Sequence, residues 1–185
     1  MQKQLYYLFA HPDRRRSQAN RTIFEHVRTL ENVTAVDLYD SYPGFHIDVE
    51  REQARLKAHD VIVIQHPIYW YSVPPLLKLW MDEVLELGFA YGPGGTALEG
   101  KGLQLSVTTG GGADAYSDEG FHGHPFEAFL LPWVQTARLC KMEWLPPLVL
   151  HGARRASALE IQAHAEHVRG HVVSLVNPAF VREGG

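Results

Sequence analysis

Three glycines followed by a phenol and an imidazole form the first stretch of this chain that could do chemistry. Gly110, Gly111 and Gly112 end the segment TTGGG, and Tyr116 and His122 follow shortly after. Glycine leaves the backbone bare, so its N–H groups can approach a ligand without interference from a side chain. A phenol and an imidazole can donate further hydrogen bonds to negative charge. The stretch predicts a site for a flat or anionic molecule, although a tight turn would also need glycine.

A second candidate stretch, AHPDRRRSQAN, precedes a predicted helix. Ser17 is a candidate N-cap, and the free N–H groups at a helix start favour a phosphate dianion. His11, Ser17 and Asn20 could each give that phosphate a further hydrogen bond. The alternative is an ordinary capped helix with a solvated arginine run. The motif GxxxxGK[ST] is missing from this loop, which favours a simple phosphate ester over a nucleoside triphosphate.

A third stretch, QHPIYWYSVPP, is rich in aromatic residues. Pro67 and a later proline pair frame an extended loop, because residues before proline avoid helical geometry. Tyr69, Trp70 and Tyr71 in this loop could offer an apolar wall, and their backbone amides could bond the edge of a flat heterocycle. Alternatively, these rings only fill the edge of the sheet.

The three stretches each follow a strand of one predicted parallel sheet. Short apolar runs alternate with helical patterns along the chain, which is typical of an α/β protein with crossover helices. The unbroken run VIVI predicts a strand that is buried on both faces near the sheet centre. Five such units indicate a flavodoxin-like, three-layer, doubly wound five-stranded sheet of order 2-1-3-4-5, whose ligands bind beyond the carboxyl ends of the strands. The predicted strands are 5–10, 34–39, 61–66, 103–108 and 147–152, and the predicted helices are about 17–30, 50–58, 74–87, 124–141 and 157–176.

Composition narrows the class of protein. With 185 residues, 45% of them hydrophobic, the chain can form one domain over 1–185 with a substantial core. A formal net charge of -4 lacks the basic excess of a nucleic-acid binder, so no nucleic-acid partner is expected. No apolar run approaches the roughly 20 residues of a membrane span, and nothing resembles a signal peptide, which predicts a cytoplasmic protein. The lone Cys140 is predicted to be a buried, inert thiol.

Taken together, the three stretches resemble the NAD(P)H quinone oxidoreductase family of flavodoxin-like proteins that bind FMN or FAD. The segments HPD…SQAN, QHPIYWYSVPPLLKLWMDEVLELGFAYGPGG and TTGG…Y…H carry the resemblance, together with FHIDVEREQ and WLPP. More narrowly, the chain is similar to short bacterial members, of the KefF and KefG type, that act as ancillary subunits of glutathione-gated potassium efflux antiporters. The resemblance extends over nearly the whole chain.

The resemblance implies a bound FMN, in preference to FAD, with NAD(P)H as co-substrate and a quinone as acceptor. It also implies that Tyr116 and His122 are catalytic, because the matching residues of the larger quinone reductases stabilise negative charge on the reduced flavin. The implied flavin contacts all lie in the three stretches: His11, Ser17, Gln18, Ala19 and Asn20 at the phosphate; Pro67, Ile68, Tyr69, Trp70 and Tyr71 along the ring; Thr109, Gly110, Gly111 and Gly112 at its pyrimidine end.

The predicted reaction is a ping-pong exchange, in which NAD(P)H delivers a hydride to FMN and leaves before the quinone takes it. In the resembling family the site lies at the interface of a homodimer, where aromatic residues of GFAY from one subunit close the pocket of the other. Phe89 and Tyr91 are the matching residues, and they would complete a substrate pocket with Trp70, Tyr116 and His122.

Two other functions remain open at this point. The chain could be a non-catalytic FMN-binding subunit that regulates a potassium/proton antiporter from the inner face of the membrane. The intact pair Tyr116 and His122 favours an enzyme, whereas similarity to KefG-like chains, including ARR at 153–155, favours the regulator. A one-electron flavodoxin is disfavoured, because those carriers are usually more acidic.

Two clusters of basic residues give weaker evidence of function. His164, His167 and His171 share one flank of the last helix, but no carboxylate or cysteine completes a tetrahedral set, so no metal site is predicted. The arginines 14–16 could meet the extra phosphate of NADPH or could simply be solvated. The choice between NADH and NADPH therefore stays open.

Overall fold

The computed structural model describes residues 2–13 and 15–177, so Arg14 and the chain from Pro178 onward lie outside it. Its strands are β1 (Leu5–Phe9), β2 (Val33–Asp37), β3 (Val61–Pro67), β4 (Gly102–Thr108), β5 (Glu143–Trp144) and β6 (Leu148–Leu150). Its helices are α1 (Gln18–Val27), α2 (Leu38–Ser41), α3 (Val49–Ala58), α4 (Pro75–Val84), α5 (Leu131–Leu139) and α6 (Ala158–Val176), with short 3₁₀ helices at Ala113–Ala115 and Phe126–Leu130.

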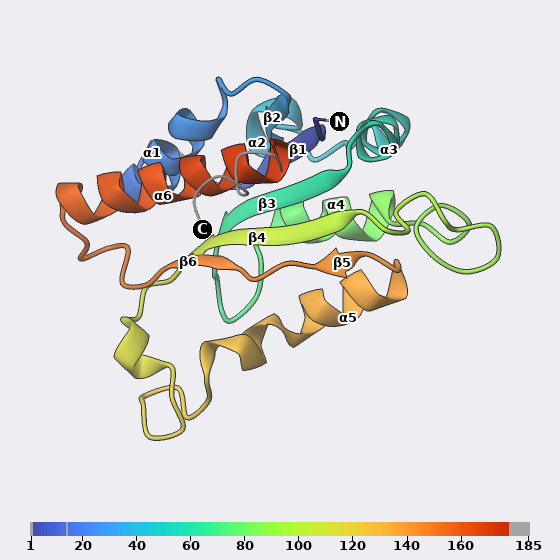
Figure 1. Cartoon of the computed structure of the whole chain (residues 1–185). Coiled ribbons are helices and arrows are strands. Elements are labelled where there is room, and N and C mark those ends of the chain that lie inside the picture. The colour runs from blue at the N-terminus through green and yellow to red at the C-terminus, as the bar shows by residue number, and fades with distance from the viewer. Residues whose placement is uncertain (1, 14, 178–185) are drawn as a thin grey trace.

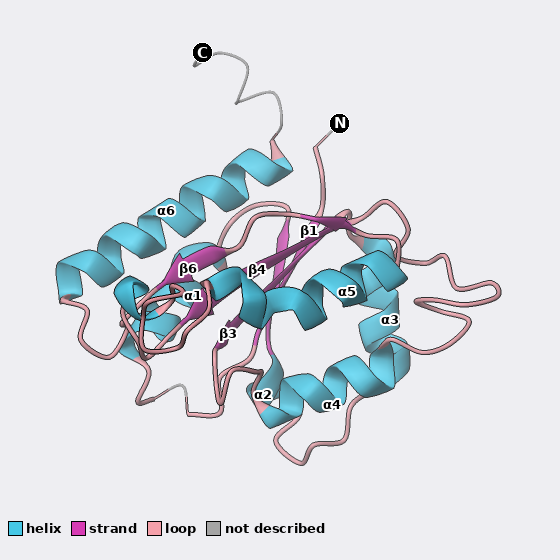
Figure 2. Ribbon diagram, turned by 90° about the horizontal axis from the view of Figure 1, so that it is seen from below, coloured by secondary structure: helices cyan, strands magenta, loops and turns pink. Residues whose placement is uncertain are grey.

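The strands form one parallel sheet in the order β2-β1-β3-β4-β5, and β6 pairs with β4 as well. Figures 1 and 2 show α1 and α6 on one face of this sheet and α3, α4 and α5 on the other. The predicted flavodoxin-like order 2-1-3-4-5 is therefore confirmed. Successive strands are joined through helices, which places the loops after β1, β3 and β4 at one edge.

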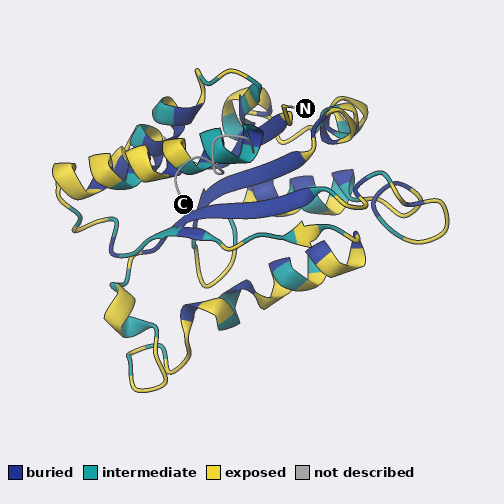
Figure 3. Cartoon of the chain, in the orientation of Figure 1, coloured by how far each residue is buried: buried dark blue, intermediate teal, exposed yellow. Residues whose placement is uncertain are grey.

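The sheet is covered on both faces along its central strands. All residues of β3 and β4 are buried (Figure 3), as the unbroken apolar run VIVI predicted. Tyr6 and Leu8 of β1 pack toward α3 and α4, whereas Tyr7 and Phe9 pack toward α1 and α6. Two buried layers therefore hold the carboxyl ends of β1, β3 and β4 in fixed positions.

The fifth predicted strand differs from the observed one. Instead of a single strand over 147–152, the chain forms β5 and β6, which both pair with β4 and are separated by the segment 145–147. Pro146 and Pro147 lie in that segment, and proline has no N–H to contribute to a strand ladder. The interruption brings the residues after β6 next to the glycine loop that follows β4.

Two other elements also differ from prediction. The strand predicted over 34–39 ends at Asp37, whose carboxylate accepts hydrogen bonds from the N–H groups of Tyr39 and Asp40 and so starts α2. The helix predicted over 124–141 is a 3₁₀ helix followed by α5, and Pro132 occupies the first turn of α5, where no N–H is needed. Cys140 follows α5 and is buried, as predicted, and burial raises the pKa of its thiol.

A buried carboxylate fixes α3 against the sheet. Glu52 is fully buried and accepts hydrogen bonds from the Tyr6 hydroxyl at 2.6 Å, the Tyr42 hydroxyl at 2.7 Å and the Trp80 Nε1–H at 3.0 Å. Arg55 adds an ion pair to the same carboxylate. A buried charge with this many partners is satisfied, so this cluster holds helices in place and has no spare group for a ligand.

Candidate functional site

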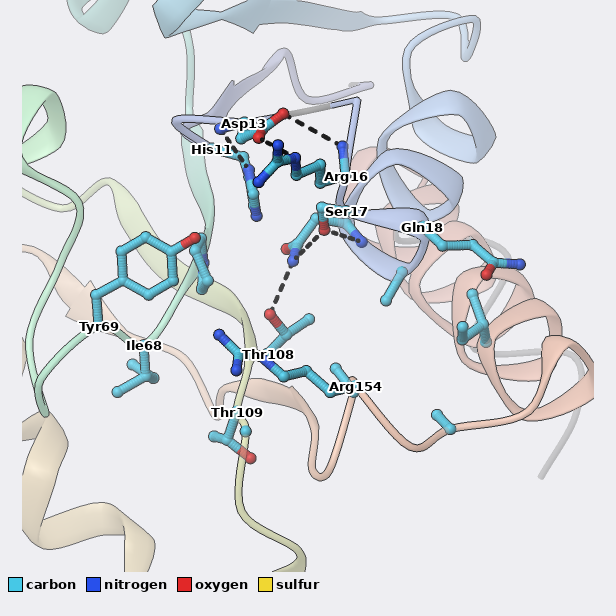
Figure 4. Close-up of a pocket in the computed structure, with 17 residues that line it drawn as sticks. His11, Asp13, Arg16, Ser17, Gln18, Ile68, Tyr69, Thr108, Thr109 and Arg154 are labelled. Atoms are coloured by element: carbon cyan, nitrogen blue, oxygen red, sulfur yellow. Dashed lines mark hydrogen bonds and ion pairs between the residues drawn. The ribbon is translucent and has the colours of Figure 1, made fainter.

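A cavity of about 640 Å³ lies at the carboxyl edge of the sheet, between the loops after β1, β3 and β4 and the segment that leads into α6 (Figure 4). This is the edge at which the predicted binding loops were expected to meet. The cavity is lined by His11, Asp13, Arg16, Ser17, Gln18, Ala19, Asn20, Pro67, Ile68, Tyr69, Thr108, Thr109, Gly110, Ala153, Arg154, Ala156 and Ile161.

One end of the cavity is the start of α1. Ser17 is its N-cap, as predicted, and the Ser17 Oγ accepts the N–H of Asn20 at 3.3 Å. The first N–H groups of a helix have no acceptor within the helix. No hydrogen bond among the described residues takes the N–H groups of Gln18 and Ala19. This end of the cavity therefore offers unpaired donors and the positive end of a helix dipole to an anion.

His11 adds a hydrogen-bond donor, and the contacts of its ring define its tautomer. Its Nδ1 accepts the N–H of Asp13 at 3.0 Å, so in the neutral ring the proton is on Nε2. Burial lowers the pKa of His11, and the carboxylate of Asp13 only partly opposes that change. The side chain is only 7% exposed and lines the cavity. A neutral imidazole can thus present an Nε2–H to a ligand without carrying a charge.

Asn20 has a different role from the predicted one. Its Nδ2 donates to the Thr108 Oγ1 at 2.8 Å and to the Ser17 Oγ at 3.1 Å, which uses both of its amide hydrogens. Gln65 Nε2 donates to the backbone carbonyl of Asn20 at 2.8 Å, and the Tyr7 hydroxyl donates to Gln65 Oε1. Asn20 therefore ties the start of α1 to β3 and β4, and its side-chain donors are not available to a phosphate.

The aromatic loop after β3 makes a tight turn. Tyr69 and Ser72 exchange backbone hydrogen bonds, and the two residues between them have positive φ angles, 50° at Trp70 and 61° at Tyr71. Two consecutive positive φ angles define a type I′ turn, which normally takes asparagine, aspartate or glycine. A bulky residue in this conformation costs of order 1–3 kcal/mol. Because Trp70 is 92% exposed, the alternative that its ring fills the sheet edge is wrong.

The glycine loop after β4 forms the other side of the cavity. Among the described residues, none of the N–H groups of Gly110, Gly111 and Gly112 donates a hydrogen bond. A Cβ on Gly111 would stand 3.1 Å from His122 Nε2 and 3.4 Å from Tyr116 Cε2, which is tighter than a Cβ normally packs. The bare backbone at this point therefore leaves room for the phenol and the imidazole.

Tyr116 and His122 lie against each other beside this loop. Their ring centroids are 4.4 Å apart, and Phe126 and Phe129 pack on the Tyr116 ring edge-on. His122 Nδ1 is buried and has no hydrogen-bond partner among the described residues. The structure therefore brings the predicted pair together next to Gly111. Trp70, Tyr71, Gly111, Gly112 and this pair are not among the residues that line the cavity itself.

A fourth segment contributes to the cavity and was not predicted. Ala153, Arg154 and Ala156, between β6 and α6, line it together with Ile161. Figure 4 shows the Arg154 side chain extending from this segment toward Ile68 and Tyr69. Burial raises the pKa of Tyr69, and the charge of Arg154 opposes that rise. The rule that ligands bind at the carboxyl ends of strands also covered this loop, and Gly152, directly before the segment, was a glycine signal that the prediction did not use.

The predicted pocket residues Phe89 and Tyr91 lie elsewhere. They follow α4, at the edge of the sheet opposite the cavity (Figure 1). Phe89 is only 8% exposed and packs in the core, with Lys57 Nζ 5.4 Å from the centroid of its ring. The prediction that these two residues close the pocket of the other subunit of a homodimer concerns a second chain, and it stays a prediction.

The described residues hold no group of three or more histidine, cysteine, aspartate or glutamate side chains arranged to bind a metal ion. His171 instead contacts the amide of Gln104 through its Nε2 at 2.9 Å. His164 is partly buried, and burial lowers its pKa to about 4. In the same part of the chain, no helix is long and apolar enough to cross a membrane.

A doubly wound parallel sheet of order 2-1-3-4-5 with its cavity at the carboxyl edge is the flavodoxin-like arrangement. Residues 3–172 match the protein family described as having a flavodoxin-like fold, and the chain belongs to that family. It is 48% identical over 158 residues to the glutathione-regulated potassium-efflux system ancillary protein KefG of Escherichia coli, which covers 85% of this chain and 86% of that protein.

Two crystal structures show the same fold at substantial identity. The general stress protein 14 of Treponema denticola, in complex with FMN, is 35% identical with a TM-score of 0.89, covering 93% of this chain and 99% of that chain. An NADPH-quinone reductase from P. pentosaceus is 30% identical with a TM-score of 0.80, covering 91% and 96%. The resemblance found in the sequence motifs is therefore confirmed.

Proposed function

We propose that the cavity binds FMN and that the chain is an FMN-dependent NAD(P)H:quinone oxidoreductase. The observation that carries this proposal is the pattern of unpaired donors at the cavity: the start of α1 and the neutral His11 at one end, and at the other end Gly110, the first of three glycines whose N–H groups donate no hydrogen bond among the described residues. FMN has a phosphate at one end and a ring with electronegative atoms at the other. The FMN complex of the Treponema denticola relative supports the same choice.

The phosphate end of the cavity fits a monophosphate. The N–H groups of Gln18 and Ala19 and the Nε2–H of His11 would hold it, with the Ser17 hydroxyl beside them. Arg154 has no carboxylate partner among the described residues and would add a charge-assisted contact. The start of α1 can bind one phosphate. FMN has one phosphate and FAD has two, which favours FMN.

When bound, FMN would supply hydride exchange between NAD(P)H and a quinone in two successive half-reactions. The role of the chain is to hold FMN and to stabilise negative charge on its ring. The N–H groups of Gly110, Gly111 and Gly112 would donate to negative charge at the pyrimidine edge of the ring. Tyr116 and His122 would add donors beside Gly111, and preorganised donors of this kind stabilise a developing charge without having to reorient.

The quinone and nicotinamide pocket is completed, in this proposal, by a second copy of the chain. Tyr71 and Phe121 have exposed rings that contact His122, and the neighbouring Trp70 is also exposed. Exposed aromatic surface of this kind is typical of an interface. A homodimer would cover these rings and could bring Tyr91 of the second copy toward them. Sedimentation of the purified protein as a dimer is the expected result, and a monomer at micromolar concentration would contradict this pocket.

A second function is suggested by the KefG relative. At 48% identity, the chain is a candidate ancillary subunit of a glutathione-gated potassium efflux antiporter, bound at the cytoplasmic face of the membrane. Regulation could accompany turnover, or the chain could bind FMN without catalysing hydride transfer. Potassium efflux from cells that express the antiporter with and without this chain tests the role, and equal efflux would exclude it.

The FMN site is tested by comparing two flavins. Riboflavin has the same ring as FMN and lacks the phosphate, so a site built on the start of α1 should bind FMN much more tightly. Quenching of flavin fluorescence gives both dissociation constants. Equal affinities for the two flavins would contradict the phosphate site, and the absence of binding to either would contradict the whole assignment.

A further inference from the structure

We infer that His151 is a positioning residue of the proposed flavin site, because it holds the glycine loop in the conformation that presents its N–H groups. This inference rests on the proposed function. His151 directly follows β6, and its Nδ1 lies 3.1 Å from the Thr109 Oγ1. Thr109 begins the glycine loop. The imidazole therefore contacts the loop at its first residue.

The hydrogen bonds of Thr109 fix the tautomer of His151. The Thr109 hydroxyl donates its one proton to the carbonyl of Gly111 at 2.7 Å. It can then only accept from His151, so His151 must carry a proton on Nδ1. Burial lowers the pKa of His151, although Glu127 opposes that change, which leaves the ring neutral. The neutral ring thus donates through Nδ1–H to Thr109.

Hydrogen bonds from the 151–153 segment hold the carbonyls of the glycine loop on the side that faces this segment. Ala153 N–H donates to the Thr109 carbonyl at 2.9 Å, and Gly152 N–H donates to the Gly111 carbonyl at 2.7 Å. In a trans peptide the N–H points away from the preceding carbonyl. The N–H groups of Gly110 and Gly112 consequently point away from the 151–153 segment. Their availability to a ligand depends on this set of bonds, in which the Thr109 hydroxyl is the central group.

His151 also contacts the predicted catalytic pair. Its ring centroid is 5.2 Å from that of Tyr116 and 5.0 Å from that of Phe126. Tyr116 therefore packs between His151 and His122. One side chain thus supports both sets of proposed donors, the glycine N–H groups through Thr109 and the phenol through ring contact.

Three variants test this role. In His151→Asn the amide nitrogen can take the place of Nδ1 and donate to Thr109, whereas in His151→Gln the nitrogen takes the place of Nε2, and His151→Leu has no donor. We expect His151→Asn to bind FMN within twofold of the wild type, and His151→Gln and His151→Leu to bind about 3- to 10-fold more weakly. Wild-type affinity in His151→Leu, or equal weakening in all three variants, would overturn the assignment.

A second measurement needs neither a variant nor a ligand. The ¹⁵N chemical shifts of the His151 ring in the free protein report which nitrogen carries the proton, and the Nδ1–H tautomer is expected at neutral pH. An Nε2–H tautomer would overturn the role of His151 even if FMN binds. Conversely, an Nδ1–H tautomer in a protein that fails to bind FMN would refute the flavin proposal and leave the hydrogen-bond assignment intact.

Discussion

At the α1 end of the cavity, Asn20, Gln65 and Tyr7 are buried and hydrogen-bonded to one another, whereas Trp70 and Tyr71 form an aromatic end of the site outside the cavity lining, where they are exposed and held at positive φ. The first end is complete within one chain, because its polar groups are satisfied except for the donors that face the cavity. The second end exposes apolar rings and stores backbone strain. In the proposed function, the first end would bind the phosphate of FMN and the second would be completed by a substrate or a second subunit.

The largest expected effect concerns Tyr116, which lies between the two ends. Tyr116→Phe removes one proposed donor and keeps the ring that packs on His151 and His122. Loss of one preorganised donor typically lowers the rate by about 10²–10³-fold. Stopped-flow reduction of the bound flavin by NAD(P)H should slow by that amount, with little change in the dissociation constant for FMN. Unchanged reduction kinetics would remove Tyr116 from the mechanism.

The next largest effect concerns His66, whose protonation should lower the stability of the fold. His66 is completely buried, stacks on Trp133 and has a pKa lowered by burial to about 4, so it stays neutral in the fold. As the pH falls from about 6.5 to 4, His66 binds a proton in the unfolded chain but not in the native chain. The free energy of unfolding should therefore be highest above pH 6.5 and fall by about 3 kcal/mol toward pH 4 from this group alone.

Urea unfolding at pH 7 and at pH 4.5 measures this loss of stability. His66→Phe keeps an aromatic ring against Trp133 and removes the titrating group, so its unfolding free energy should depend less on pH. His124→Gln, a change at an exposed histidine, is the matched control and should keep the wild-type dependence. An identical pH dependence in all three proteins would show that His66 is not the group responsible.

A smaller effect is expected at the start of α1, where the proposed phosphate would bind. Proline is tolerated at the first position of a helix, where it removes only an unpaired N–H. Gln18→Pro should therefore weaken FMN binding by about 10- to 100-fold, since a hydrogen bond to a charged group contributes about 1.5–3 kcal/mol. Riboflavin binding should not change. Ala158→Pro makes the same change at the start of α6 and should leave both affinities unaltered; equal losses in the two variants would contradict the phosphate assignment.

The smallest effect measures strain at the aromatic end. Asparagine is favoured where type I′ turns need positive φ, so Trp70→Asn should raise the free energy of unfolding by about 1 kcal/mol. Trp70→Ala also removes the exposed ring but keeps a residue that is disfavoured at positive φ, so it should give no such gain. Chemical denaturation compares the two variants. Equal stability would show that the turn stores no strain.

The sequence was sufficient to predict the sheet order and the three loops at its edge, because these follow from apolar runs and from glycine and proline positions. It was not sufficient for groups whose roles depend on partners distant in the chain. Asn20 looks like a phosphate ligand until Thr108 is seen to accept from it, and Arg154 enters the cavity through a loop without a recognisable motif. His151, directly after β6, contacts Thr109, which lies 42 residues earlier in the chain. Phe89 and Tyr91 were predicted to close the pocket of a second subunit, and that prediction depends on a contact between two chains.

The most direct test of the central claim is anaerobic reduction of the protein saturated with FMN. NAD(P)H is added in the absence of oxygen, the visible absorbance of the flavin is followed, and a quinone is then introduced. The account predicts rapid bleaching by NAD(P)H and recovery of the absorbance with the quinone. A bound flavin that stays oxidised in the presence of NAD(P)H would contradict the reductase and favour an FMN-binding regulatory subunit.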